Sequence, residues 1–217
     1  MNLLIVDDHP LLRAGIKVIL SKNSLYNIEE AGGGEEAISL IKANLYNFVI
    51  LDIDMPGING VELAVFIKNN HPDIKIIFLT SHADIYTFSE AIETSFSGFL
   101  FKENAIDQIN DCLKIVSRGE KYLSKSCTDF LFANKEKLTS IKKIKKAFKQ
   151  LTDAEINVLR LISEGKTTPQ IAECLFNSPK TIENHRTNIC QKLELKGSNN
   201  LLTFALENKW VFKNDKN

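Results

Sequence analysis

The sequence predicts an α/β domain followed by an all-α domain, and two observations lead to this prediction. Through the first 118 of 217 residues, short apolar runs alternate with segments whose apolar residues recur at helical spacing. This alternation is typical of an open parallel sheet with helices on its faces. From residue 151 onward, only the helical spacing remains. We therefore expect a five-stranded parallel sheet and, after it, an all-α module of four helices.

The elements of the first domain follow from this alternation in order along the chain. The run Phe48-Val49-Ile50-Leu51 is apolar throughout, which indicates a strand that is buried on both faces. Strands are predicted at residues 3–6, around Ile28, and at residues 48–51, 74–79 and 99–101. Helices are predicted at residues 10–20, 35–43, 60–69, 85–94 and 105–116.

Capping signals mark the helices of the second domain. Thr152, followed three residues later by Glu155, predicts a capping box, and Gly165 predicts the end of that helix. Ser178 and Pro179 are typical of a helix start, with Ser as cap and Pro at the first position. The remaining helices are predicted at residues 169–175, 180–193 and 199–207. The tight turn before residue 180 predicts a helix-turn-helix.

Charge divides the chain into three parts, although the net charge is zero. Residues 1–118 hold 16 acidic and 9 basic side chains, which gives −7. Residues 119–150 hold 3 acidic and 9 basic side chains (+6), and residues 151–217 hold 8 and 9 (+1). The distribution predicts a first domain at 1–118, a basic, partly helical linker at 119–150 and a second domain at 151–217.

Composition argues against several classes of protein. No apolar run approaches the roughly 18 residues that a membrane span needs, and the N-terminus is typical of a first strand rather than of a signal peptide. We therefore expect a cytoplasmic protein without a membrane partner. The four cysteines are scattered and form no C-x-x-C pair, which disfavours a zinc site or a disulfide framework.

Polar residues occur where the predicted strands end. Asp7 and Asp8 follow the first strand, Asp52 the third, Thr80 the fourth and Lys102 the fifth. Ligands of open α/β sheets bind beyond the carboxyl ends of the strands, so these side chains can converge. Three carboxylates repel one another unless a cation joins them, and oxygen ligands favour Mg²⁺. A carboxylate next to that metal can attack a phosphoryl group.

The N-terminal part of the sequence resembles the receiver domains of bacterial two-component response regulators. The segments that carry the resemblance are "IVDDHP", "VILDIDMPGINGVEL", "FLTSH" and "GFLFKE". The resemblance covers residues 2–118 and implies a flavodoxin-like sheet. It implies that Asp52 is the phosphoacceptor. It also implies that Mg²⁺ is bound by Asp7, Asp8, Asp52 and the backbone carbonyl of Asp54. Thr80 and Phe99 would form the switch pair, and Lys102 would sense the phosphoryl group.

Residues 151–209 resemble the LuxR-type DNA-binding domain. The helix at 169–175 would be the supporting helix and the helix at 180–193 the recognition helix, with Ile182, Ile189 and Leu193 toward the core. The predicted DNA contacts are Lys180, Thr181, Asn184, His185, Arg186, Asn188 and Lys192. His185 could equally be a buried histidine that packs the domain. The resemblance suggests that the last helix forms a dimer contact on DNA.

Two alternatives remain open from the residues themselves. The D-x-D of Asp52 and Asp54 resembles the opening of haloacid-dehalogenase-type phosphatases, but there the acidic metal pair follows the motif, whereas Asp7 and Asp8 precede it here. Glu183 stands where many relatives have lysine, which leaves room for a protein-binding regulator without DNA contact.

The favoured interpretation is a NarL/FixJ-type response regulator. It would be phosphorylated on Asp52 with a sensor histidine kinase as partner. It would bind double-stranded DNA, form a homodimer when phosphorylated or DNA-bound, and not be an enzyme.

Overall fold

The computed structural model describes residues 1–81, 84–195 and 198–212, and it divides the chain into two compact units. The N-terminal unit is Met1–Leu138 and the C-terminal unit is Thr139–Asn217. Of the predicted features, His82 of the "FLTSH" segment and the last residues of the second domain, 213–217, lie outside the described residues. Within the described part of the chain, none of the helices has the length and apolar content that a bilayer span requires.

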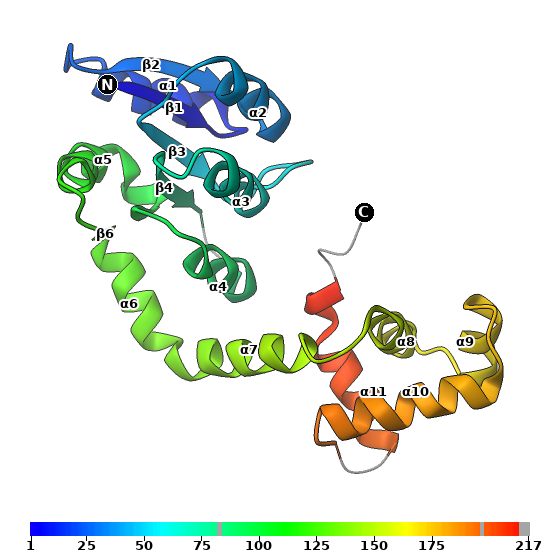
Figure 1. Ribbon diagram of the computed structural model, residues 1–217. Coiled ribbons are helices and arrows are strands. Elements are labelled where there is room, and N and C mark those ends of the chain that lie inside the picture. Colours follow the sequence, from blue (N-terminus) through cyan, green and yellow to red (C-terminus); the bar gives the residue numbers. More distant parts are fainter. Residues whose placement is uncertain (82–83, 196–197, 213–217) are drawn as a thin grey trace. The chain divides into compact units, whose positions relative to one another are not determined.

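The N-terminal unit is built on a parallel sheet (Figure 1). Its strands are β1 (Asn2–Val6), β2 (Asn27–Ala31), β3 (Phe48–Asp52), β4 (Lys75–Thr80), β5 (Gly98–Phe101) and β6 (Tyr122–Leu123). Their order across the sheet is β2-β1-β3-β4-β5-β6, and every neighbouring pair is parallel. The predicted parallel receiver-type sheet is confirmed, with one strand more than the five expected.

The sixth strand arises from a local turn. Gly119 has a φ of +85°, a conformation that glycine adopts without steric cost, and the chain turns back along the edge of the sheet. Tyr122 then pairs with Gly98, and Leu123 with Phe99. A two-residue strand carries no recognisable alternation of polar and apolar residues, so the sequence alone did not predict it.

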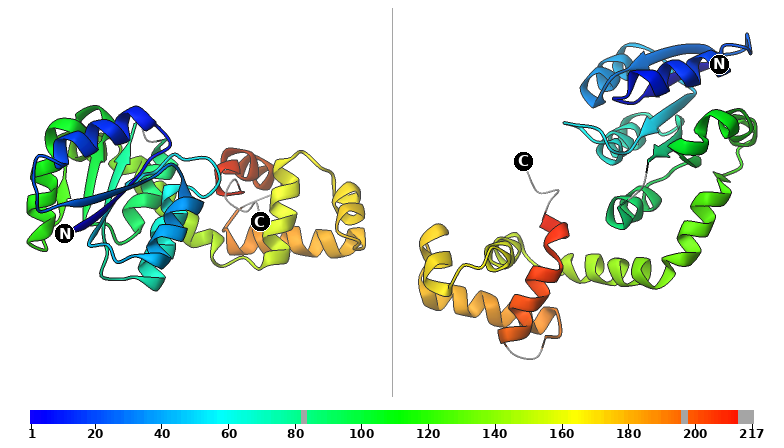
Figure 2. Two further views of the ribbon diagram at one scale, coloured as in Figure 1. Left: turned by 90° about the horizontal axis from the view of Figure 1, so that it is seen from above. Right: turned by 180° about the vertical axis from the view of Figure 1, so that it is seen from behind.

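Helices cover both faces of the sheet (Figure 2). One face is covered by α1 (Pro10–Leu20) and α5 (Lys102–Ser117), and the other by α2 (Gly34–Ala43), α3 (Gly60–Asn70) and α4 (Ile85–Glu93). In β1, Leu3 and Ile5 pack on the first face while Leu4 and Val6 pack on the second. Strands that are buried on both sides explain why their sequences are continuously apolar.

The segment predicted as a basic linker is largely packed. Helix α6 (Lys125–Ala133) belongs to the N-terminal unit, where Cys127 is completely buried and Phe130 contacts the helix α4 residue Phe88 with ring centroids 4.8 Å apart. Helix α7 (Lys135–Phe148) contains the boundary between the two units. The expected linker therefore contributes to both units, because its scattered apolar residues are spaced for helix packing.

The C-terminal unit contains the four predicted helices. They are α8 (Asp153–Ser163), α9 (Thr168–Cys174), α10 (Pro179–Lys192) and α11 (Ser198–Glu207), followed by the 3₁₀ helix η1 (Lys209–Phe212). The capping box of Thr152 and Glu155 is present, and Gly165 ends the first helix with φ +80°. Apolar residues from all four helices, such as Leu159, Ile171 and Ile182, form one core.

Candidate functional site

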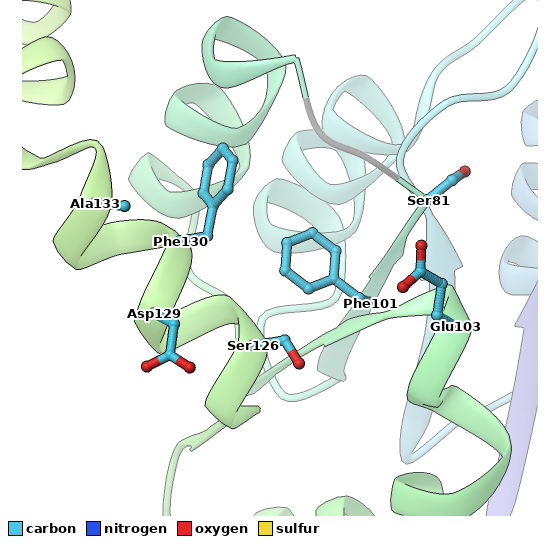
Figure 3. Close-up of a pocket in the computed structure, with 7 residues that line it drawn as sticks. All are labelled: Ser81, Phe101, Glu103, Ser126, Asp129, Phe130 and Ala133. Carbon is cyan, nitrogen blue, oxygen red and sulfur yellow. The ribbon is translucent and has the colours of Figure 1, made fainter.

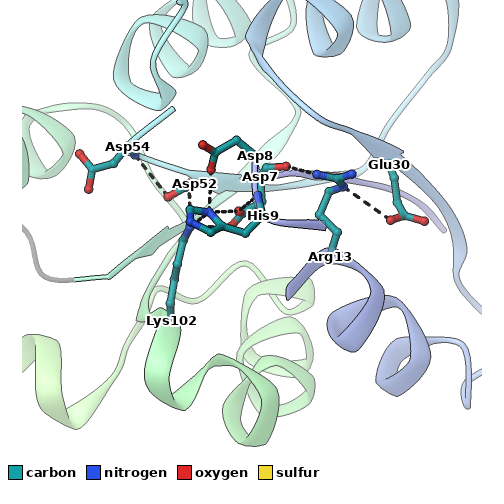
Figure 4. A network of polar contacts seen from close by, with 8 residues as sticks. All are labelled: Asp7, Asp8, His9, Arg13, Glu30, Asp52, Asp54 and Lys102. Carbon is teal, nitrogen blue, oxygen red and sulfur yellow. Dashed lines mark hydrogen bonds and ion pairs between the residues drawn. The ribbon is translucent and has the colours of Figure 1, made fainter. Parts of the chain in front are cut away.

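The strand ends gather charged side chains at one edge of the sheet (Figure 4). Asp52 is the last residue of β3 and is paired with Leu79, one residue before the end of β4 at Thr80. Lys102, the first residue of α5, places its Nζ 2.7 Å from Oδ2 of Asp52 and 2.8 Å from Oδ2 of Asp7. Residues almost a hundred positions apart in the sequence are thus joined by direct ion pairs.

Burial sets the protonation chemistry of this cluster. The side chains of Asp7 and Asp52 are fully buried. Burial raises the pKa of Asp52 to about 6, and the nearby Asp7 charge adds to this, while the hydrogen bond from Lys102 opposes it. Burial disfavours the charged Lys102 ammonium, but hydrogen bonds to Asp52 and Asp7 outweigh burial and raise the pKa of Lys102. Above about pH 6 the Asp52 carboxylate is therefore charged, and the Lys102 ammonium is its ion-pair partner.

The donor set fits a small divalent cation. Ligand atoms of Asp7, Asp8, His9 and Asp52 all lie within 4.8 Å of one another. Oδ1 of Asp8 and Oδ2 of Asp52 are buried, and each lies within ion-pair distance of a basic side chain, His9 at 2.6 Å and Lys102 at 2.7 Å. Carboxylate oxygens in this state are suitable ligands for Mg²⁺.

Asp54 differs from the other acidic residues of the cluster. Its backbone N–H donates a hydrogen bond of 3.3 Å to Oδ1 of Asp52. Its carboxylate is exposed and points away from the Asp52 side chain (Figure 4). This arrangement keeps the Asp54 carboxylate out of the cluster, and the Mg²⁺ contact of the Asp54 backbone carbonyl stays a prediction.

Sequence reasoning did not single out two neighbours of the cluster. Nδ1 of His9 lies 2.6 Å from Oδ1 of Asp8 and 3.0 Å from Oδ1 of Asp7. The Arg13 guanidinium donates to the backbone carbonyl of Asp7 and faces Glu30 with Nε 3.7 Å from Oε2. Arg13 lies one helical turn after His9, at the spacing that places two side chains on one helix face, and this spacing was the available signal.

The two predicted switch residues occupy different environments. The Thr80 hydroxyl is buried, and it has no hydrogen-bond partner among the described residues. Phe99 is fully buried inside an aromatic cluster, with ring centroids 4.8 Å from Phe88, 5.6 Å from Phe78 and 5.7 Å from Phe96. A polar atom without a partner and a ring held by other rings are both sensitive to a group added nearby.

A cavity of about 410 Å³ lies beside α6 (Figure 3). Its lining residues are Ser81, Phe101, Glu103, Ser126, Asp129, Phe130 and Ala133. The predicted phosphoacceptor, metal and switch residues are not part of this lining, although Ser81 follows Thr80 and Glu103 follows Lys102 in the chain.

Helix α10 presents the predicted recognition surface. Ile182 and Ile189 are fully buried, as expected for the core side. Lys180, Asn184 and Asn188 are exposed. The remaining predicted contacts are partly exposed, namely Thr181, His185, Arg186 and Lys192.

Two lysines of this surface form ion pairs within the unit. Lys192 Nζ lies 2.7 Å from Oε2 of Glu155, the buried capping-box residue of α8. Lys180 Nζ lies 3.6 Å from Oε2 of Glu183. The sequence did not reveal that Lys192 has a partner within the unit, because Glu155 is 37 residues away.

Comparison with known proteins agrees with both halves of the fold. The family model of the response regulator receiver domain matches residues 3–114, and that of the bacterial regulatory proteins of the luxR family matches residues 149–205. The fold and the matched domains define a receiver joined to a helix-turn-helix output domain. The chain belongs to the NarL/FixJ family of two-component response regulators.

Relatives match over nearly their whole length. The chain is 30% identical to the transcriptional regulatory protein DegU of Brevibacillus brevis, over 97% of this chain and 95% of DegU. It is 31% identical to the response regulator UvrY of Escherichia coli K12, over 95% and 94%. A structure of two RcsB dimers bound to two parallel DNAs has a TM-score of 0.58 and 27% identity, over 94% of this chain and 97% of that one. The prediction of a two-component transcription regulator is confirmed.

Proposed function

We propose that Asp52 accepts a phosphoryl group from a sensor histidine kinase and that this modification controls DNA binding by the C-terminal unit. One observation carries the proposal: the Asp52 carboxylate is buried at a strand end with Oδ2 2.7 Å from Lys102 and with Asp7 and Asp8 beside it. A carboxylate in this setting is a nucleophile for phosphoryl transfer rather than a structural ion pair.

The transfer exchanges one bond to phosphorus for another. An Asp52 oxygen forms a bond to phosphorus while the bond from phosphorus to the kinase histidine nitrogen breaks. The electron pair of that bond stays on the nitrogen, and one proton, taken up by the ring, leaves the imidazole neutral. Mg²⁺, held by Asp7, Asp8, Asp52 and the Asp54 backbone carbonyl, would neutralise the phosphoryl oxygens. Lys102 is already within ion-pair distance of Asp52 and can balance the added charge.

The signal would pass through the two switch residues. The unpartnered Thr80 hydroxyl can donate to a phosphoryl oxygen. A movement of Thr80 at the end of β4 leaves space that the Phe99 ring on β5 can occupy, and the aromatic cluster then repacks. We infer that this repacking favours dimers on DNA.

DNA would be read by α10 in the major groove, through Lys180, Thr181, Asn184, His185, Arg186, Asn188 and Lys192. Leu202 and Leu206 on α11 are 41% and 46% exposed, which supports a homodimer contact through this helix. In this proposal residues 1–118 form the receiver domain that is phosphorylated, residues 151–217 bind DNA, and the protein acts in the cytoplasm.

The decisive experiment is selection of duplex DNA from a random pool with and without a small phosphodonor and Mg²⁺. We expect a common half-site to be enriched only with donor, together with a phosphoryl label on Asp52 in mass spectrometry. The Asp52→Asn variant is the control and should show neither. A label on another side chain, or a site enriched equally without donor, would contradict the proposal.

A protein-binding regulator without DNA contact is the second candidate. It is favoured by one observation, namely that Lys180 and Lys192 of α10 are held by carboxylates. Such a regulator would show no salt-dependent retention on duplex DNA, whereas the proposed function requires it.

We also propose that the chain has no phosphatase turnover. The exposed Asp54 carboxylate points away from Asp52, so it is poorly placed as a general acid. Asp54→Asn should therefore leave phosphorylation of Asp52 largely unchanged. Release of many phosphates per chain by the native protein, abolished in this variant, would show an enzyme instead.

A further inference from the structure

The recognition helix has little free positive charge for the phosphate backbone. Helix α10 carries Lys180, Arg186 and Lys192 against Glu183, a net +2. Lys192 is paired with Glu155 and Lys180 with Glu183. Among the described residues, Arg186 is thus the one cation of α10 outside an ion pair. Non-specific DNA affinity depends on the number of phosphates that cations neutralise, so a second basic surface in the same unit would raise it.

The C-terminal half of α7 supplies such a surface. Residues 139–150 contain five lysines and no acidic residue, a charge of +5, against +1 for all of residues 151–217. Lys142, Lys143, Lys146 and Lys149 are exposed, and none of them forms an ion pair within the part of the chain that the structure describes. We call Lys142, Lys146 and Lys149 the lysine face.

The lysine face is fixed to the same body as the recognition helix. The Phe148 ring of α7 stacks on Phe204 of α11 with centroids 5.9 Å apart, and it meets Phe212 edge to face at 5.6 Å. Phe148 and the partly buried Ile144 belong to the core of the C-terminal unit. This packing holds the C-terminal end of α7 in the same unit as α10.

The geometry of α7 separates its charged and apolar sides. Lys142 and Lys146 are four residues apart and lie on one face of α7. Lys149 follows the end of α7 by one residue, and its N–H still donates to the carbonyl of Lys145, which keeps it on the same side. Ile141 and Phe148 are buried on the other side. A helix with one apolar and one uniformly basic side presents a row of cations to a partner that carries a row of anions.

We propose that the lysine face binds the phosphate backbone of duplex DNA alongside the groove that α10 reads. This inference rests on the DNA-binding function proposed above and adds the element that provides most of its electrostatic affinity. Phosphate contacts fix position and carry no sequence information, so the lysine face should raise affinity for every duplex equally.

The test is the salt dependence of binding by the full-length protein to a mixed-sequence duplex. The variant K142Q/K146Q/K149Q should lower the slope of log K against log salt concentration by about 2 to 3, since each phosphate contact contributes roughly 0.9. The control K22Q/K42Q/K114Q removes the same charge from exposed lysines of the N-terminal unit and should keep the native slope. An unchanged urea midpoint in Trp210 fluorescence confirms that the C-terminal unit is folded.

Each possible result either supports or overturns the assignment of the lysine face to DNA. A slope lowered in the α7 variant alone supports the proposal. A native slope in that variant, or an equal fall in the control, overturns it while DNA binding itself stands. Loss of binding to phosphatidylglycerol vesicles with a native DNA slope makes the partner a lipid surface and also overturns it. If the native protein shows no salt-dependent DNA binding, the proposed function fails as well.

A second measurement distinguishes contacts to the phosphate backbone from contacts to the bases. On the half-site obtained by selection, the α7 variant should bind specific and mixed duplexes more weakly by the same factor. The variant N184A/N188A should instead lower the ratio of specific to mixed binding. A lowered ratio in the α7 variant would overturn the assignment of the lysine face to phosphates.

Discussion

Asp52 combines two properties that oppose each other in a folded protein. Its carboxylate is fully buried, which disfavours its charge, and it stands beside Asp7, whose charge repels it. Lys102 compensates in part through two ion pairs. At the scale of single residues, the site therefore holds a buried carboxylate whose charge is only partly compensated, which is typical of a functional site rather than of a structural ion pair.

Replacement of Asp52 by Asn should stabilise the chain near neutral pH in the absence of Mg²⁺. The pKa of Asp52 is raised from 3.8 to about 6 in the folded state, so the folded chain loses stability as the pH rises from about 4 to 6. We expect Asp52→Asn to gain on the order of 2 kcal/mol at pH 7.5, and about half of that at pH 5.

Calorimetry of both proteins at the two pH values measures this difference. Mg²⁺ should then stabilise the native chain more than the variant, because it relieves the repulsion that the variant lacks. A native protein that is the more stable of the two at pH 7.5 without Mg²⁺ would show that Lys102 fully compensates the buried charge.

Gly60 lies so close to the end of β3, which carries Asp52, that a larger residue does not fit there. A Cβ at this position would lie 2.0 Å from the backbone oxygen of Asp52 and 2.8 Å from Cα of Ile53. Gly60→Ala should therefore displace the end of β3, destabilise the chain by about 3 kcal/mol and slow phosphorylation.

Urea unfolding and labelling by a phosphodonor measure the two effects of Gly60→Ala. Gly32→Ala is the matched control, since its added Cβ would meet Glu36 Oε2 at 3.6 Å, an ordinary contact. Native-like labelling by Gly60→Ala would mean that β3 and α3 can separate without moving Asp52.

At the scale of elements, α8 and α10 are joined by one buried carboxylate. Glu155 accepts from the backbone of Thr152 in the capping box and also pairs with Lys192 at 2.7 Å. Burial alone would raise the pKa of Glu155, but these hydrogen bonds outweigh burial and lower it below 4.5. The recognition helix is thus attached to the start of the domain by charge as well as by its apolar side.

Glu155→Gln should destabilise the C-terminal unit by about 1 to 2 kcal/mol at pH 7. Because the folded-state pKa is lowered, this contribution is complete above pH 4.5 and is lost as the pH falls through the folded-state value. The native protein and the variant should therefore converge in acid.

Fluorescence of the single tryptophan, Trp210, follows unfolding of the C-terminal unit. The control for Glu155→Gln is Glu164→Gln, which removes an exposed partner of Arg160. We expect it to change the free energy of unfolding by less than about 0.5 kcal/mol. An equal loss in both variants would mean that the Glu155 pair is no stronger than a surface pair.

At the scale of the whole molecule, the N-terminal unit ends at Leu138 and so extends 20 residues past the predicted receiver domain, residues 1–118. Phe130 of α6 packs edge to face on Phe88 at 4.8 Å and on Phe101 at 6.0 Å. Cys127 is completely buried in the same core. Strand β6 and helix α6 therefore cover an apolar face that the first 118 residues alone would expose.

A fragment of residues 1–138 should be more stable than a fragment of residues 1–118 by at least about 3 kcal/mol, the usual effect of deleting a buried aromatic ring. Urea unfolding followed by circular dichroism measures the difference. Phe130→Ala in the full chain should reproduce most of it. Equal midpoints for the two fragments would place the stability of the receiver entirely within residues 1–118.

The sequence by itself determined the features that depend on local pattern. Alternating apolar runs and helical segments predicted the parallel sheet, and the capping box at Thr152 and the break at Gly165 predicted a helix with its limits. The strand ends predicted that Asp7, Asp8, Asp52 and Lys102 share one edge, because parallel strands of one sheet all end there.

Only the tertiary structure decided which side chains meet across long separations. The pairing of Lys192 with Glu155, the packing of Phe130 on Phe88 and the placement of β6 beside β5 each join distant parts of the chain. Local propensity leaves no trace of these contacts, because each depends on burial that exists only after the elements have assembled. The lysines of α7 are likewise visible in the sequence. That they belong to the C-terminal unit became clear only from the packing of Phe148 in the core of that unit.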